Sequence, residues 1–233
     1  MTILILQHSP VEHAGVFRDF LLEDRLDWHT VELDKGEPIP DLAPFDLMIA
    51  MGGPQHVWQE DQYPWLQGEK AAIRTFVVSM RRSFLGICLG HQLLAEAVGG
   101  CVRPAKVPEI GVFKAFKTPE GKLDPMLRGV PDPMTVFEWH GAEVVSLPIG
   151  TSVLARTDTC QIQAFRYGDR AYGTQFHAEV IKTTVADWSA AYGTAVALEK
   201  QVTGKVDAAL TELNRDARTI YQNLKSVWAR SSC

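Results

Sequence analysis

The first hundred residues alternate short apolar runs with segments of helical periodicity. The apolar runs are short enough for strands, and the third is typical of a strand buried on both faces. They lie at residues 2–6, 28–33, 46–51 and 84–87. Helical spacing follows at residues 14–22, 71–80 and 91–98. This order predicts an α/β fold, doubly wound, with a mostly parallel central sheet and helices on both faces.

The next seventy residues have a different pattern, in which prolines and glycines separate short segments. This pattern favours additional strands, several of them antiparallel. The expected strands lie at residues 109–117, 134–138, 142–147, 152–157, 161–167 and 171–176. We therefore expect a small antiparallel strand region beside the parallel sheet.

Beyond residue 180 the chain becomes helical again. Apolar residues from Val206 to Val227 alternate spacings of four and three, which form one continuous stripe on a helix. A helix packed on its own domain is the simplest interpretation. A coiled-coil seam or partner-binding helix is the alternative, which leaves a homodimer open. We predict one domain over residues 1–184, with a helical extension at residues 185–233 packed on it.

Composition narrows the class of protein. The chain has 233 residues, 46% of them hydrophobic and 22% charged, as in an ordinary soluble globular protein. Its net charge of -5 argues against binding to the negatively charged backbone of nucleic acid. No apolar run has membrane-spanning length, and the first residues lack the basic region of a signal peptide, so a cytoplasmic protein is expected.

The cysteines and histidines are scattered. The four cysteines are Cys88, Cys101, Cys160 and Cys233, and none forms a C-x-x-C pair. The seven histidines likewise show no metal-ligand spacing. We therefore expect no metal site, and a compartment that keeps thiols reduced.

The strongest local signal is a cysteine between two glycines. Cys88 follows the apolar run at 84–87 and precedes the helical segment at 91–98, with Gly86 and Gly90 two residues to either side. Glycines at these positions relieve crowding where a strand turns sharply into a helix and presents a nucleophile. The N-terminus of the following helix favours thiolate over thiol. An inert buried cysteine is the alternative interpretation.

A histidine and a carboxylate stand two residues apart far downstream. In an extended chain His177 and Glu179 point to the same side, so Glu179 can orient the imidazole while His177 serves Cys88. The three residues together indicate nucleophilic catalysis by a cysteine. His91 lies about one helical turn after Cys88 and is expected to pack rather than take protons.

Four motifs in order resemble the class I glutamine amidotransferases of the triad type, especially the glutaminase portion of GMP synthase and its stand-alone relatives. The resemblance spans roughly residues 2–180. Its motifs are Gly52-Gly53-Pro54, Gly86-Ile87-Cys88-Leu89-Gly90-His91-Gln92, Glu138-Trp139-His140-Gly141 and Gly173-Thr174-Gln175-Phe176-His177-Ala178-Glu179-Val180. It implies a flavodoxin-like architecture, with Cys88 as nucleophile, His177 as acid and base, and Glu179 as its orienting partner.

The resemblance also implies roles for residues around the triad. Backbone N–H groups near Gly53 and Leu89 would form the oxyanion hole, as expected for the residue after an elbow nucleophile. The substrate-binding set would be Gly52, Gln92, Trp139, His140 and Gly141. Simpler interpretations are a turn at 52–53, a solvated helix residue at Gln92 and a hydrogen-bonded core histidine at His140.

Two departures from the family pattern matter. Ala178 stands where the family usually has proline between the triad histidine and glutamate, and alanine fixes the backbone less. No P-loop and no acceptor-processing region occur in these 233 residues, so any synthetase would be a separate subunit.

The expected reaction needs no cofactor. Its small-molecule substrate is glutamine or another γ-glutamyl compound, and it releases ammonia from glutamine through a glutamyl thioester. A self-sufficient γ-glutamyl hydrolase or peptidase is one alternative. A non-catalytic binding or regulatory module is the other.

Overall fold

The computed structural model describes residues 1–229, so the prediction for Cys233 lies outside the described residues. Within this range nine strands form one sheet in the order β2-β1-β3-β4-β9-β8-β7-β5-β6. The strands are β1 (Ile3–Gln7), β2 (Trp28–Glu32), β3 (Leu47–Ala50), β4 (Ser83–Ile87), β5 (Cys101–Lys117), β6 (Met134–Ser146), β7 (Thr151–Arg156), β8 (Ala164–Tyr167) and β9 (Ala171–Thr174).

The sheet has a parallel half and an antiparallel half. Neighbouring strands from β2 to β9 are parallel, and those from β9 to β6 are antiparallel. The predicted fold class, a largely parallel sheet with an antiparallel region, is confirmed. Strand β9 joins the halves, because it pairs in parallel with β4 and in antiparallel with β8.

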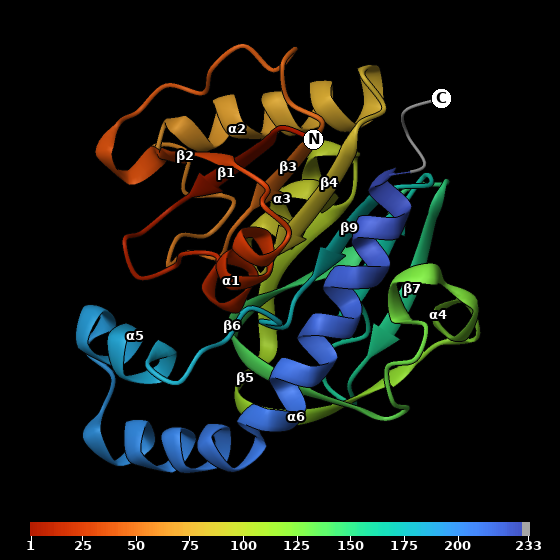
Figure 1. The fold of residues 1–233 in the computed structure, drawn as a ribbon. Coiled ribbons are helices and arrows are strands. Elements are labelled where there is room, and N and C mark those ends of the chain that lie inside the picture. The colour runs from red at the N-terminus through yellow and green to blue at the C-terminus, as the bar shows by residue number, and fades with distance from the viewer. Residues whose placement is uncertain (230–233) are drawn as a thin grey trace.

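Helices cover both faces of the sheet. The helices are α1 (Gly15–Glu23), α2 (Trp65–Arg74), α3 (Leu89–Ala97), α4 (Pro119–Leu123), α5 (Thr184–Tyr192) and α6 (Val196–Ala229). Figure 1 shows α6, in blue, crossing the sheet on the side of α1. Helices α2 and α3 contact each other on the opposite face. The apolar side chains of the two faces form separate clusters, because the buried strands contribute alternate residues to each.

Several boundaries differ from the sequence expectation. Two predicted strands, at 134–138 and 142–147, are one strand, β6, that runs through residues 139–141. Strand β5 begins at Cys101 rather than residue 109, and its pairing with β6 shifts register between Pro104 and Glu109. A bulge of this kind accommodates proline within a strand.

Helix α2 begins at Trp65, earlier than predicted, and the described part of the predicted helical extension consists of α5 and α6. Helix α6 packs against α1, α5, β5 and β6. The division at residue 184 and the homodimer stay predictions. Among residues 1–229, no helix combines the length and the apolar character needed to cross a membrane.

Candidate active site

Cys88 occupies the sharp turn between β4 and α3. Its backbone has a φ of 51°, in the left-handed region that side-chain-bearing residues rarely adopt. Its N–H donates to Thr174 O at 2.8 Å, which ties the turn to the end of β9. Strained backbone held by a surrounding framework is typical of functional positions.

The two flanking glycines are required by close packing. A Cβ on Gly86 would lie 2.3 Å from Gly90 O, and a Cβ on Gly90 would lie 2.1 Å from Ala50 O. Neither glycine has a positive φ, so Cys88 carries the backbone strain itself. Glycine is therefore required at both positions because a side chain would collide with neighbouring backbone. It is not required for backbone dihedral angles that other residues avoid.

His177 and Glu179 lie just beyond β9, next to the end of β4. His177 Nδ1 is 2.7 Å from Glu179 Oε1, and both side chains are buried. Ala178 in place of proline therefore does not separate the carboxylate from the ring. The His177 backbone N–H donates to Phe137 O at 2.8 Å, and the imidazole meets the Trp188 ring edge-on, with centroids 4.6 Å apart. Backbone and side chain are thus both held in place.

Cys88 and His177 are electrostatically coupled. Burial raises the pKa of the Cys88 thiol, and the nearby His177 opposes that rise. Burial alone would lower the pKa of His177, but Glu179 and Cys88 together hold it well above its ordinary value. The advantage that the α3 N-terminus gives to thiolate is thus opposed by burial.

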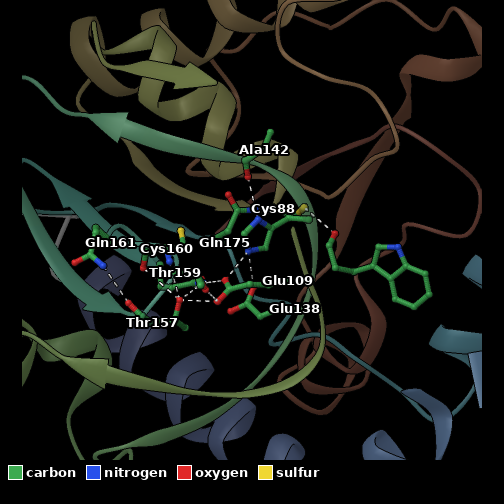
Figure 2. A network of polar contacts seen from close by, with 12 residues as sticks. Cys88, Glu109, Glu138, Ala142, Thr157, Thr159, Cys160, Gln161 and Gln175 are labelled. Atoms are coloured by element: carbon green, nitrogen blue, oxygen red, sulfur yellow. Dashed lines mark hydrogen bonds and ion pairs between the residues drawn. The ribbon is translucent and has the colours of Figure 1, made fainter. Parts of the chain in front are cut away.

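Neither the sulfur of Cys88 nor Nε2 of His177 has a close hydrogen-bond partner in the described residues. Within residues 1–229, His177 Nε2 makes no hydrogen bond of regular geometry. The Cys88 thiol makes a long contact of 3.9 Å to Trp139 O. Figure 2 shows Cys88 with this contact at one side of a larger polar network.

The backbone N–H groups of Gly53 and Leu89 are those expected to form the oxyanion hole. The N–H of Gly90 donates to Met51 O, and that of Cys88 is used by Thr174. The N–H groups of Gly53 and Leu89 donate to no loop, turn or side-chain acceptor of the described residues. Both residues line the same pocket as Cys88. This is the arrangement that an oxyanion hole needs.

The pocket over Cys88 has a volume of about 270 Å³. Most of the residues expected from the sequence line it, whereas Gly52, His177 and Glu179 are not among the lining residues. Gly52 lies next to Glu12 and His177. The lining residues are Glu12, Gly53, Pro54, Gln55, His56, Cys88, Leu89, Gln92, Pro108, Ile110, Trp139, His140, Gly141, Ala142 and Tyr192. They come from the carboxyl ends of the parallel strands and the start of α3, as expected for an open α/β sheet, and from β5, β6 and α5.

Gln92 and His140 are held in a buried network at one end of the pocket. Gln92 Nε2 donates to Ala142 O at 3.2 Å and to Gln175 Oε1 at 3.0 Å. His140 Nδ1 lies 3.0 Å from Ala142 O, and its Nε2 lies 2.9 Å from Glu109 Oε2. The interpretation of Gln92 as a solvated helix residue is therefore wrong, because its side chain is buried. His140 is a hydrogen-bonded core residue that also lines the pocket.

A second cluster of glutamate, histidine and cysteine lies behind His140. Ligand-type atoms of Glu109, His140 and Cys160 fall within 4.8 Å of one another. The Glu109 carboxylate, however, already accepts hydrogen bonds from four side chains, those of His140, Thr157, Thr159 and Gln163 (Figure 2). These bonds account for the cluster without a cation.

Sequence reasoning missed Glu12 and Tyr192. Glu12 lies in the turn after β1, and its carboxyl accepts a hydrogen bond from Tyr192 OH at 3.2 Å. Its position beyond the carboxyl end of a parallel strand is a signal that was present in the sequence. Tyr192, at the end of α5, had no comparable signal.

The chain matches known proteins over most of its length. The sequence profile of the family described as "Glutamine amidotransferase class-I" matches residues 20–187. A glutamine amidotransferase-like protein of Salmonella typhimurium is 32% identical over 185 residues, covering 77% of this chain and 76% of that protein. A glutamine-hydrolyzing GMP synthase subunit of Saccharolobus solfataricus is 36% identical over 148 residues, covering 63% and 74%.

Solved structures agree with the sequence matches. The crystal structure of a glutamine amidotransferase from Thermotoga maritima superposes with a TM-score of 0.82 at 30% identity, covering 99% of this chain and 97% of that one. A glutamine amidotransferase from Methylobacillus flagellatus gives a TM-score of 0.83 at 27% identity, covering 97% and 94%.

Proposed function

Because this chain belongs to the class I glutamine amidotransferases, we propose that it hydrolyses glutamine at Cys88, releasing ammonia through a glutamyl thioester. The observation that carries the proposal is the strained turn at Cys88. It presents the thiol to a pocket beside an imidazole whose other nitrogen is fixed by Glu179 at 2.7 Å. A cysteine, a base and a group that orients the base are the parts that nucleophilic catalysis requires.

The first half of the reaction forms the thioester. Cys88 Sγ attacks the side-chain amide carbon, and the carbonyl oxygen becomes an oxyanion that accepts hydrogen bonds from Gly53 N–H and Leu89 N–H. His177 Nε2 donates its proton to the nitrogen, the C–N bond breaks and ammonia leaves. The raised pKa of His177 supports this step, because the ring is protonated before the attack.

In the second half, water replaces the nitrogen. His177, now neutral, takes a proton from water while the oxygen attacks the thioester carbon. The C–S bond breaks, glutamate is released and the thiolate of Cys88 is restored. Glu179 holds the ring in one tautomer throughout, because its carboxylate accepts from Nδ1.

The far end of the pocket would hold the amino-acid part of the substrate. Gln92, Trp139, His140 and Gly141 line that end, and Gly52 supports the wall beneath. No lysine or arginine is among the lining residues, so backbone N–H groups and neutral side chains would hold the α-carboxylate.

The names of the relatives support a partner. Because several relatives are named as one subunit of a glutamine-hydrolyzing GMP synthase, we propose that a separate synthetase protein consumes the ammonia. A pull-down with this chain as bait should recover an ATP-using protein that raises glutamine turnover.

The test of the reaction is direct. Purified chain is incubated with glutamine and, separately, with a panel of γ-glutamyl amides and γ-glutamyl peptides, and ammonia, amine and glutamate are measured. Ammonia and glutamate in equal amounts from glutamine are expected. Turnover of γ-glutamyl peptides with none of glutamine would instead indicate a self-sufficient γ-glutamyl hydrolase. No turnover of any compound and no labelling of Cys88 by a glutamine-mimicking diazoketone would refute catalysis.

A further inference from the structure

Glu12 is a buried carboxyl group that the proposed reaction does not use. Its Oε1 accepts a hydrogen bond from Tyr192 OH, whereas its Oε2 has no partner in the described part of the chain. The free oxygen lies where Gly52 lacks a side chain. A Cβ on Gly52 would lie 2.6 Å from Glu12 Oε2 and 3.0 Å from His177 Cε1. Glu12 therefore flanks the imidazole on a side that Glu179 does not occupy.

The groups around Glu12 set its charge. The titratable side chains that face it are His8, Cys88, His177, Glu179 and Tyr192. Burial raises the pKa of Glu12 to about 7, with His177 pulling it down and Glu179 pushing it up. His8 is itself paired with Glu69 at 2.9 Å, so it offers Glu12 little compensation. A negative Glu12 in turn raises the pKa of the Cys88 thiol.

The two halves of the reaction favour opposite charge states of Glu12. The sulfur ionises most readily when Glu12 is neutral, because two adjacent anions repel each other. The imidazole takes a proton from water most readily when Glu12 is negative, because a nearby anion stabilises imidazolium. A neutral Glu12 thus favours the attack on the amide. A negative Glu12 favours hydrolysis of the thioester, when the sulfur carries no charge.

Resting on the proposed function, we propose that Glu12 is a positioning residue for thioester hydrolysis, neutral while Cys88 is the free nucleophile and ionised while Cys88 is acylated. Its carboxylate acts through His177, which it makes a stronger base toward water. The total charge beside the imidazole then stays nearly constant through the cycle.

The protons balance over one turnover. When the thioester forms, the proton lost from Glu12 passes to the released ammonia, which becomes ammonium. When water cleaves the thioester, the C–O bond forms, the C–S bond breaks and His177 keeps the proton taken from water. The new γ-carboxylic acid of glutamate is more acidic than Glu12 in this site, so its proton returns to Glu12. The sum is glutamine and water giving glutamate and ammonium.

The test separates the two halves of the reaction in Glu12→Gln. Excess enzyme is mixed with glutamine and quenched at intervals, ammonia and glutamate are measured, and intact mass detects the glutamyl adduct on Cys88. Glutamate formation should slow at least about tenfold, consistent with weakened general-base catalysis. Ammonia should still appear at the wild-type rate, so the adduct accumulates. Glu120→Gln, an exposed glutamate in α4, is the matched control and should show no adduct.

A second measurement does not depend on glutamine. Alkylation of Cys88 by iodoacetamide should be unchanged in Glu12→Gln below about pH 7, where Glu12 is neutral in wild type, and faster than in wild type above it, because the variant lacks the charge that then repels the thiolate. Slower alkylation together with equal losses of ammonia and glutamate would show a merely structural role. Alkylation unchanged at every pH, with glutamate formed at the wild-type rate, would show no role at all. Either result overturns the proposal. If Glu12→Gln does not fold, Tyr192→Phe tests the same point, because loss of that hydrogen bond disfavours the carboxylate.

Failure of the proposed function has a different signature. In that case the wild-type protein itself forms no glutamyl adduct and releases no ammonia from glutamine. The alkylation comparison would still report whether Glu12 controls the charge on Cys88.

Discussion

Within residues 1–229 two clusters are built from the same three residue types, and they differ in whether the histidine keeps a ring nitrogen without a hydrogen-bond partner. Cys88, His177 and Glu179 meet beside a pocket, and His177 Nε2 has no regular hydrogen bond within residues 1–229. In the second cluster, Glu109 and His140 are bonded on every side, and Cys160 lies behind them (Figure 2). Residue type alone therefore does not decide which cluster is reactive.

The two cysteines differ in their backbone and in their electrostatic partners. Cys88 lies at a strained turn, and a neighbouring imidazole favours its thiolate. Burial, together with the nearby carboxyl groups of Glu138 and Glu109, raises the pKa of Cys160 to about 12. Carboxylates near both cysteines oppose ionisation, and at Cys88 the imidazole of His177 counters them.

The two histidines show the same contrast. Both have a carboxylate within 2.9 Å of one ring nitrogen. In His140 the second nitrogen is used by Ala142 O, so the ring joins two parts of the fold. In His177 the second nitrogen is left for chemistry. One cluster stabilises the fold, and the other is arranged for proton transfer.

The largest expected difference between the clusters is in the cysteine substitutions. Cys88→Ala should lower glutamine hydrolysis at least about 10⁴-fold, because no other group can form the thioester. Cys160→Ala should keep nearly full activity and lose about 1 kcal/mol of unfolding free energy, from the small cavity left in a packed region. Ammonia release and urea unfolding measure the two effects. A Cys88→Ala protein that retains activity would contradict the assignment of the nucleophile.

Substitution of the carboxylates that pair with the two histidines should change different properties, kcat at Glu179 and the free energy of unfolding at Glu109. Glu179→Gln should lower kcat by about 10²-fold to 10⁴-fold with little change in stability, because the ring loses its fixed tautomer. Glu109→Gln should instead lower the free energy of unfolding by about 3 kcal/mol, because it breaks a buried pair and leaves His140 without its carboxylate. Steady-state kinetics measure kcat, and urea titrations measure the free energy of unfolding, for both variants. Equal effects of the two variants on kcat would argue against this difference.

Much of the parallel half could be predicted from the sequence, because local signals agree there. Short apolar runs, helical spacing and the Gly86–Cys88–Gly90 turn each indicate the same strand and helix order, and the structure has that order. The antiparallel half was less predictable. Glycine at 141 and prolines at 104 and 108 resemble breaks, but β5 and β6 continue through them, because pairing over a long hairpin and a bulge outweighs local preference.

Some residues of the site could likewise be predicted from the sequence, and others could not. The triad could be read from motifs, because each of its members has a local signature at a strand end. Glu12 and the Glu109 cluster could not, since their significance depends on contacts between residues far apart in sequence, such as Glu12 with Tyr192 and Glu109 with His140. A carboxylate beyond a parallel strand, such as Glu12, is a candidate by its position alone, and its role is defined only once the fold buries it beside Tyr192.

The smallest expected effect concerns Glu138, the carboxyl group beside the closed cluster. Burial and the neighbouring Glu109 hold the pKa of Glu138 well above its ordinary value, and neither of its oxygens has a hydrogen-bond partner in the described structure. A raised pKa in the folded state contributes stability that is fully present below the unfolded pKa, about 4.3, and is lost as the pH rises. Glu138→Gln removes that loss, so the variant should be more stable than wild type by about 1 kcal/mol near pH 7 and no more stable near pH 4. Urea unfolding at the two pH values measures the difference, with Glu120→Gln as the exposed control. A Glu138→Gln protein that is less stable at pH 7 would mean that the carboxyl group takes part in hydrogen bonds that the amide cannot replace.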